Sequence, residues 1–257
     1  MDIDLLKDLL EQKVIQYNVP EFAESDPVQI PRSFLLKEDI EISAFLTATI
    51  AWGNRASVIK SSKNMMDIMG NSPYDFIMSH SESDLDRMSN FVHRTFQPID
   101  LITFVKALKH IYSNHGGMEK VFFEHQRDGF MHYAIHEFKR KFFEVGHQQR
   151  TQKHVADPMK NGSHAKRIHL FLKWMIRQDN GGVDIGIWKS IPTSVLSCPL
   201  DVHTGRVGRH LELITIKQDN LKALNQLDEA LRIFDAVDPA KYDVALFGLS
   251  KEGFASK

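Results

Sequence analysis

The chain has 257 residues, of which 42% are hydrophobic and 25% charged, an ordinary composition for a soluble globular protein of one or two domains. No segment approaches the ~20 consecutive apolar residues of a membrane span, and residues 1–4 lack the basic and apolar regions of a secretory signal, so we expect a cytoplasmic protein without membrane contact. The single cysteine excludes an internal disulfide and a four-cysteine iron–sulfur cluster, and the net charge of −1 argues against general affinity for nucleic acids.

Apolar residues recur at helical spacing along most of the chain, and few stretches alternate with a period of two. This pattern predicts an all-α, two-lobed body with a central cleft. We expect one folded unit over residues 1–257, made of an N-terminal helix and loop (1–37), core helices (38–143) and a C-terminal region (144–257). The predicted helices span residues 3–18, 38–52, 55–69, 82–93, 98–114, 118–146, 165–178, 203–213, 219–234 and 239–248.

A helix break near residue 53 is the first candidate for a functional turn. Residues 40–52 form an apolar helix, Gly53 and Asn54 interrupt it, and Arg55 opens a second helix. Asn and Gly are also favoured wherever a helix ends, so an ordinary helix terminus is the alternative explanation.

Cations are concentrated between residues 139 and 173, where nine Lys or Arg stand against two acidic residues. Within this run, residues 162–166 have the sequence GSHAK, a turn that leads into the apolar helix predicted from residue 165. A basic run is usually a solvated surface, and Lys166 alone is explained by a solvated lysine at a helix start. The segment that follows, residues 178–196, contains the apolar pair Ile187-Trp188, which can anchor it.

Asp201 lies where a helix must begin. Pro199 lacks an amide donor and keeps the residue before it out of the helical region, so the helix starts after Leu200 with Asp201 as its N-cap. The carboxylate then accepts from free amides of the first turn and lies at the positive end of the helix dipole, which is a sufficient structural reason for an aspartate. We expect Cys198, just before this turn, to be a buried small residue.

Thirteen histidines raise the question of a metal site. His132 and His136 are four residues apart and share one face of a predicted helix. The metalloprotease arrangement needs a glutamate directly after the first histidine, where this chain has Tyr133, and no cysteine or carboxylate cluster completes a site. We therefore expect no metal and no other cofactor.

Residues 200–213 resemble the VDxHvxRvxxRLgL segment of the helix-hairpin-helix DNA glycosylases, the endonuclease III-like superfamily. Residues 162–166 resemble the G-x-G-x-K hairpin of that superfamily, with His164 in place of the second glycine; the glycines allow backbone amides to approach a DNA phosphate. The 35 residues from Lys166 to Asp201 resemble the longer spacing of the archaeal 8-oxoguanine glycosylases. Over most of its length the chain also resembles an uncharacterised bacterial family with the segments DPVQIPRSF, FLTATIAWGNR and CPLDVHTGRVGRHLEL, which begin here at Asp26, Phe45 and Cys198.

The superfamily resemblance implies a nucleophilic lysine and a catalytic aspartate, and it assigns these roles to Lys166 and Asp201. The positions that it implies for DNA contact are Asn54, Arg55, Gly162, His164, Arg167, His203 and Arg206. Weaker candidates, for the pocket that receives the extruded base, are Trp52, Asp243 and Phe247. Burial in the core is the simpler explanation for Phe247.

The resemblance thus implies a base-excision repair glycosylase, with or without AP-lyase activity, that acts as a monomer on double-stranded DNA carrying a damaged base. Two alternatives stay open. One is a non-catalytic DNA-binding protein that keeps the glycosylase-like fold, which the missing hairpin glycine favours; the other is an α-helical scaffold for protein interactions. The enzyme requires the Lys166 amine and the Asp201 carboxylate to converge in one open cleft.

Overall fold

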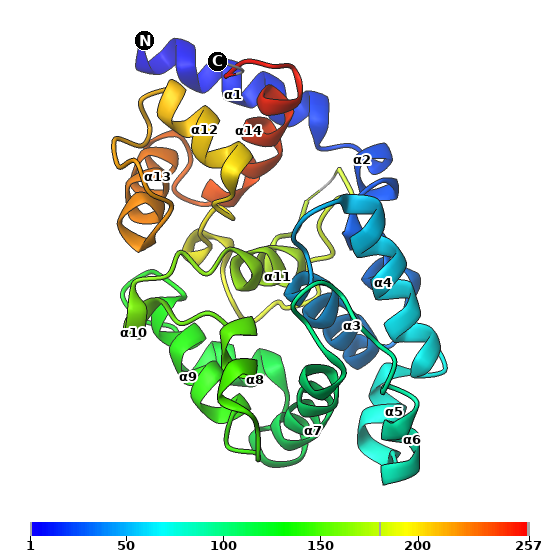
Figure 1. The fold of residues 1–257 in the computed structure, drawn as a ribbon. Coiled ribbons are helices and arrows are strands. Elements are labelled where there is room, and N and C mark those ends of the chain that lie inside the picture. Colours follow the sequence, from blue (N-terminus) through cyan, green and yellow to red (C-terminus); the bar gives the residue numbers. More distant parts are fainter. Residues whose placement is uncertain (1, 180, 256–257) are drawn as a thin grey trace.

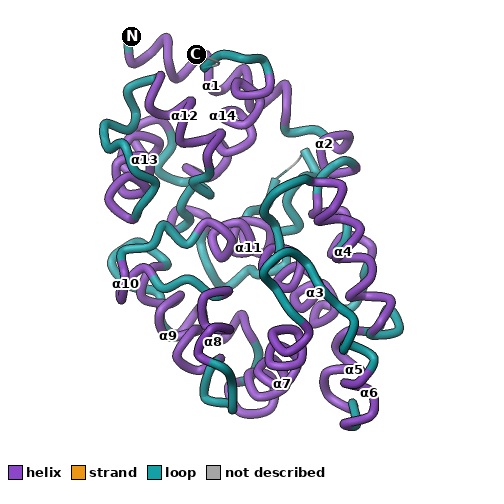
Figure 2. Tube along the Cα trace, in the orientation of Figure 1, coloured by secondary structure: helices purple, strands orange, loops and turns teal. Residues whose placement is uncertain are grey.

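A computed structural model describes residues 2–179 and 181–255. Figure 2 shows that the regular elements of these residues are helices, joined by loops and turns. The expectation of an all-α protein is therefore confirmed. Within the same ranges, we find no helix that combines the length and the apolar character needed to cross a membrane.

The α-helices vary in length from four to eighteen residues. In chain order, the α-helices are α1 (Ile3–Tyr17), α2 (Pro20–Glu24), α3 (Lys37–Thr49), α4 (Arg55–Ile68), α5 (Pro73–Ser79), α6 (Glu82–Asp86), α7 (Pro98–His115), α8 (Met118–Glu124), α9 (His132–Phe142), α10 (Pro158–Asn161), α11 (Lys166–Ile176), α12 (Val202–His210), α13 (Leu221–Phe234) and α14 (Tyr242–Lys251). The 3-10 helices are η1 (Pro27–Gln29), η2 (Pro31–Ser33), η3 (Gln149–His154), η4 (Thr193–Val195) and η5 (Pro239–Lys241).

Several boundaries differ from the sequence-based prediction. Helices α3 and α12 end at Thr49 and His210, each three residues before the predicted end, α14 is shifted by three residues from the predicted 239–248, and the short helices α2 and α10 were not predicted. The helix predicted over residues 118–146 is split into α8 and α9, because Asp128 and Gly129 adopt left-handed backbone conformations (φ 55° and 72°) that a helix cannot accommodate. The helix predicted over residues 82–93 ends with α6 at Asp86. Helix α5 was not predicted, although it begins with Pro73 at its first position, where proline is favoured.

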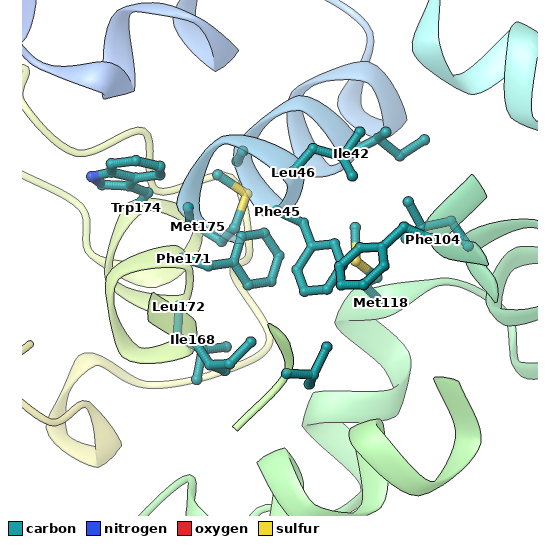
Figure 3. Close-up of a cluster of buried hydrophobic side chains, with 14 of the residues drawn as sticks. Ile42, Phe45, Leu46, Phe104, Met118, Ile168, Phe171, Leu172, Trp174 and Met175 are labelled. Atoms are coloured by element: carbon teal, nitrogen blue, oxygen red, sulfur yellow. The ribbon is translucent and has the colours of Figure 1, made fainter. Parts of the chain in front are cut away.

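The larger of two hydrophobic cores is built around α11, which lies at the centre of the molecule (Figure 1). Helix α11 is buried on most of its circumference and packs against α3. Figure 3 shows Phe45 of α3 next to Phe171 of α11 and Phe104 of α7; the centroid of the Phe45 ring is 5.5 and 5.7 Å from the other two. A core with such stacked and edge-to-face rings holds α11 rigidly, so the two ends of this helix have fixed positions.

A smaller core joins the first helix of the chain to the last three. In Figure 1, α1, α12, α13 and α14 gather at one end of the molecule, where both chain termini lie. Leu6 and Leu10 of α1 are buried among apolar residues of the C-terminal helices. Gly248 of α14 allows this close approach, because a Cβ atom at that position would lie 2.2 Å from the ring of Tyr17.

Residues 181–196 return to the C-terminal part of α11. The amides of Ile185 and Trp188 donate to the carbonyls of Trp174 (2.9 Å) and Met175 (2.8 Å). The indole of Trp188 is fully buried and donates to Glu41 of α3 at 2.7 Å. Trp188 thus anchors the segment, as its apolar character predicted.

Candidate active site

A cavity of about 870 Å³ lies between the two groups of helices. Its walls include the loop that joins α3 to α4, the start of α4, one side of α11, the start of α12, the α2–η1 segment and helix α14. Eight of the side chains nominated from the sequence line this cavity: Trp52, Arg55, His164, Lys166, Asp201, His203, Asp243 and Phe247. The volume is in the range of pockets that bind small molecules or single nucleotides.

Lys166 is placed by the turn between α10 and α11. Gly162 ends α10 with a left-handed conformation (φ 63°), and Ala165 adopts another (φ 42°), so that α11 begins at Lys166. Its Nζ atom donates to the carbonyl of Ala51 at 3.3 Å and lies 3.7 Å from Oδ2 of Asp201. The start of α11 therefore directs an amine at the α3–α4 loop and at the start of α12.

Asp201 is the N-cap of α12, as the proline before it predicted. Its Oδ1 accepts hydrogen bonds from the amides of His203 (2.8 Å) and Thr204 (2.9 Å). The other oxygen, Oδ2, is the one that faces Lys166. Since 26% of the Lys166 side chain and 27% of the Asp201 side chain are exposed, this open pair is accessible to a ligand in the cavity.

The hairpin before Lys166 differs from the expected phosphate-binding turn. His164 does not adopt a left-handed backbone conformation, so the turn does not need glycine at that position. The imidazole lines the cavity, and burial is the main cause that lowers its pKa. Gly162 uses its amide to donate to Pro158 (3.1 Å) and its carbonyl to accept from Leu221 (2.9 Å), so both groups are bonded within the protein.

Aromatic rings and a guanidinium form one wall of the cavity. The guanidinium of Arg55 lies over the rings of Phe247 (4.9 Å) and Phe22 (5.5 Å) and is 3.3 Å from the carboxylate of Asp26. Burial raises the pKa of Asp26, although Arg55 acts in the opposite direction. Asp26 and Phe22 were not nominated from the sequence; Asp26 has a local signal, since it precedes Pro27 and caps η1.

A buried cluster of charged residues extends the cavity inward from the open pair. Lys173 of α11, only 2% exposed, contacts Asp184 (3.0 Å) and Asp243 (3.3 Å). These carboxylates raise the pKa of Lys173, while burial and the nearby carboxylates of Asp201 and Asp184 raise the pKa of Asp243 to about 6. Lys173 was not nominated, but its spacing is a usable signal: it follows Lys166 by two helical turns and lies on the same face of α11.

Four nominated residues do not line the main cavity. Asn54 caps α4 by accepting from the amide of Ser57 (3.1 Å), and Gly162 lies in the hairpin. Arg167 donates to the carbonyl of Thr49 (2.5 Å) and lies over the ring of Trp52 (4.8 Å), beside a second, smaller hollow. Arg206 is exposed on α12.

The basic run of residues 139–173 is less uniformly solvated than its composition suggests. Lys173 is buried and ion-paired, and Arg167 is half-buried, where desolvation lowers its pKa to about 10. Neither cation is therefore free to contact an external phosphate in the arrangement described. Lys153 and Lys160 are exposed and form part of the basic surface.

The two histidines considered for a metal site have separate partners. His132 contacts Asn225 at 3.2 Å, and His136 contacts Asp157 at 3.1 Å. Cys198 is fully buried, as expected, and burial raises the pKa of its thiol, so this thiol is poorly suited to act as a nucleophile.

Comparison with known proteins identifies a family but no activity. A sequence profile described as "Protein of unknown function (DUF2400)" matches residues 26–252. The match covers most of the chain, and the protein belongs to this family. No curated protein and no solved structure matches the chain, so the glycosylase-like architecture stays a prediction.

Proposed function

We propose that this member of the DUF2400 family is a DNA glycosylase that removes a damaged base by means of Lys166 and Asp201. One observation carries the proposal: the amine and the carboxylate are 3.7 Å apart in a single open cavity. A nucleophile with a proton acceptor beside it is the arrangement that covalent catalysis requires.

In the proposed reaction, the damaged nucleotide leaves the duplex and its base enters the cavity. Lys166 gives up a proton to Asp201, and its nitrogen then bonds to C1′ of the sugar while the bond from C1′ to the base breaks. The base leaves with the bonding electrons and takes up a proton. Opening of the sugar ring gives a Schiff base, from which β-elimination cleaves the strand on the 3′ side.

Asp201 has an alternative proposed role. If Lys166 enters the reaction as the neutral amine, Asp201 stays ionised, and its carboxylate stabilises the positive charge that develops on the sugar as the base departs. The cap bonds from His203 and Thr204 fix the orientation of this carboxylate, so it needs no rearrangement during the reaction.

The cavity walls also support a flat, aromatic ligand. Phe247, Phe22 and Trp52 contribute aromatic side chains to its lining, and base–aromatic stacking contributes about 1–3 kcal/mol per base. Asp26 and Asp243 offer carboxyl groups at the same cavity, which can pair with the hydrogen-bonding edge of a base.

The proposal is tested by borohydride trapping. Duplexes that carry an oxidised purine, an oxidised pyrimidine, an alkylated base, a mismatch or an abasic site are incubated with the protein, and the imine is reduced to a stable adduct. We expect an adduct with the wild type on at least one duplex and a decrease of about 10³-fold or more in Lys166→Ala. Peptide mapping should locate the adduct on Lys166.

Lys160→Ala is the matched control, since this lysine is exposed on α10, only six residues away. It should trap as the wild type does. An adduct that persists in Lys166→Ala would assign the nucleophile elsewhere. Absence of both adduct and base release, together with binding to the same duplexes, would favour the non-catalytic DNA-binding alternative.

A further inference from the structure

Three side chains near the ends of helices α7 and α9 lie within hydrogen-bonding distance of one another. His110 and His115 lie on the last two turns of α7, and Glu144 follows the end of α9. The Nε2 atoms of the two histidines are 2.9 and 3.1 Å from Oε2 of Glu144 and 3.2 Å from each other. None of the three lines the proposed active-site cavity.

We infer that His110, His115 and Glu144 form a binding site for a divalent transition-metal ion, with Zn²⁺ as the best-fitting example. Two imidazoles and one carboxylate are a frequent set of three zinc ligands, with a fourth position open to water. Metal–ligand bonds of about 2.0–2.1 Å place tetrahedral ligand atoms about 3.3 Å apart. The three separations in this cluster are each within about 0.4 Å of that value.

Neighbouring groups orient the ligands. Arg140 donates to Oε1 of Glu144 at 3.3 Å, which leaves Oε2 to face the histidines. Asn114 contacts Nδ1 of His110 at 2.8 Å, and its amide can present either its oxygen or its nitrogen to that atom. Such contacts to the outer atoms of metal ligands commonly fix their orientation. The site also lies at the C-terminal end of α7, where the helix dipole favours a cation.

One neighbour opposes metal binding. The Nζ atom of Lys141 is 3.4 Å from Nδ1 of His115. In the metal-free protein, Nε2–H of both histidines can donate to Glu144 while Nδ1 of His115 accepts from Lys141. A metal on Nε2 moves the imidazole proton to Nδ1, so Lys141 must swing away, and its charge repels the ion. Lys141 therefore weakens the site, and removing it should strengthen binding.

Bound metal would join two separate elements. Because the ligands come from α7 and from the chain after α9, an ion at this point links the ends of both helices. Any ligand that binds only the folded state stabilises it, and a hundredfold excess over Kd should raise Tm by on the order of 5 °C.

The test is Zn²⁺ binding by the chelator-stripped, full-length protein, followed by calorimetry and by metal analysis after dialysis. We expect one equivalent in the wild type, a decrease in affinity of about 100-fold or more in His110→Ala and in His115→Ala, and an increase of about fivefold in Lys141→Met. Co²⁺ added in place of Zn²⁺ should give visible absorption bands that are lost in the same two variants.

His125→Ala is the matched control, since the Nδ1 atom of this histidine contacts the carbonyl of Val121 (2.8 Å) and the residue is not part of the His110–His115–Glu144 cluster. It should bind Zn²⁺ as the wild type does. Glu144→Gln keeps the size of the side chain and serves if a histidine variant folds poorly. A wild type that retains no Zn²⁺, or variants at the three positions that retain the full equivalent, would overturn the inference. Neither result bears on the proposed glycosylase activity, because the readout is metal content.

Discussion

Two lysines on the same face of α11 differ sharply in their surroundings. Lys166 begins the helix, is about a quarter exposed and faces one carboxylate at 3.7 Å. Lys173, two turns further along, is 2% exposed and contacts two carboxylates at 3.0 and 3.3 Å. Exposed ion pairs contribute about 0–1 kcal/mol, whereas breaking a buried one costs several. Helix α11 thus carries one amine that a ligand can reach and one that is buried in ion pairs.

The largest effect on stability is expected from the buried cluster. Lys173→Met removes the ammonium that contacts Asp184 and Asp243 in a buried environment, so that, among the residues that the structure describes, Asp184 keeps only its contact with the Arg177 guanidinium (3.0 Å). The free energy of unfolding should fall by about 3–5 kcal/mol, which urea denaturation monitored by circular dichroism measures. A loss below about 1 kcal/mol would mean that the two lysines are not energetically different.

The pH dependence of stability should reveal Asp243. Burial and neighbouring carboxylates raise its pKa from 3.8 to about 6, so the folded state holds this proton more tightly than the unfolded state does. The contribution of Asp243 to stability is then greatest below about pH 4 and is lost as the pH rises to about 6, a decrease of about 2–3 kcal/mol in total. Asp243→Asn should remove this decline. Urea denaturation of both proteins between pH 4 and pH 8 isolates the contribution as a difference, and parallel profiles would contradict it.

Two substitutions at Asp201 distinguish its role as a helix cap from the role of its negative charge. Asparagine caps a helix about as well as aspartate, so Asp201→Asn should keep the stability of the wild type while lowering base release by about 10²-fold or more. Asp201→Ala loses both functions and should cost about 1 kcal/mol of stability as well. Thermal denaturation and single-turnover base release would be compared on the two variants. Equal activity in Asp201→Asn and the wild type would reduce Asp201 to a helix cap.

The smallest effect on stability is expected from the substitution of Lys166. Lys166→Met, the counterpart of Lys173→Met, should change the free energy of unfolding by no more than about 0.5 kcal/mol, because its ion pair is long (3.7 Å), partly exposed and screened by solvent. Urea denaturation under the conditions used for Lys173→Met gives the two values side by side. A loss approaching that of Lys173→Met would show that Lys166 is structural.

The sequence predicted features that depend on a few adjacent residues. The helix starts at Arg55, at Lys166 and after the cap Asp201 follow from local backbone preferences, and the structure has all three within one residue of the expected position. The helix before the break is less well predicted, since α3 ends at Thr49, three residues before the expected end. The break between α8 and α9 was missed, since Asp128 and Gly129 lie within a strongly helical pattern and a single glycine is often tolerated there.

The deeper part of the site could not be predicted in the same way. Asp26 reaches the cavity from the α2–η1 segment, and Asp243 meets Lys173 from a helix seventy residues later in the chain. Such contacts depend on tertiary packing, and the residues that make them have no characteristic separation in the sequence. The metal ligands His110 and His115 share a helix, but Glu144 joins them only because α9 packs against α7. The periodicity of apolar residues within one helix does not predict which other helix it packs against.

The packing of α1 against α14 bears on how the chain is synthesised. Leu6 and Leu10 leave the ribosome about 240 residues before Leu246 and Leu249, which belong to the same core. At about 5–20 residues per second, the apolar face of α1 waits some 10–50 s for its partners. The larger core, by contrast, draws almost all its residues from positions 23–196 and can assemble earlier. During translation, the first helix made is therefore among the last to be buried, and its exposed apolar face is a natural point of contact for chaperones.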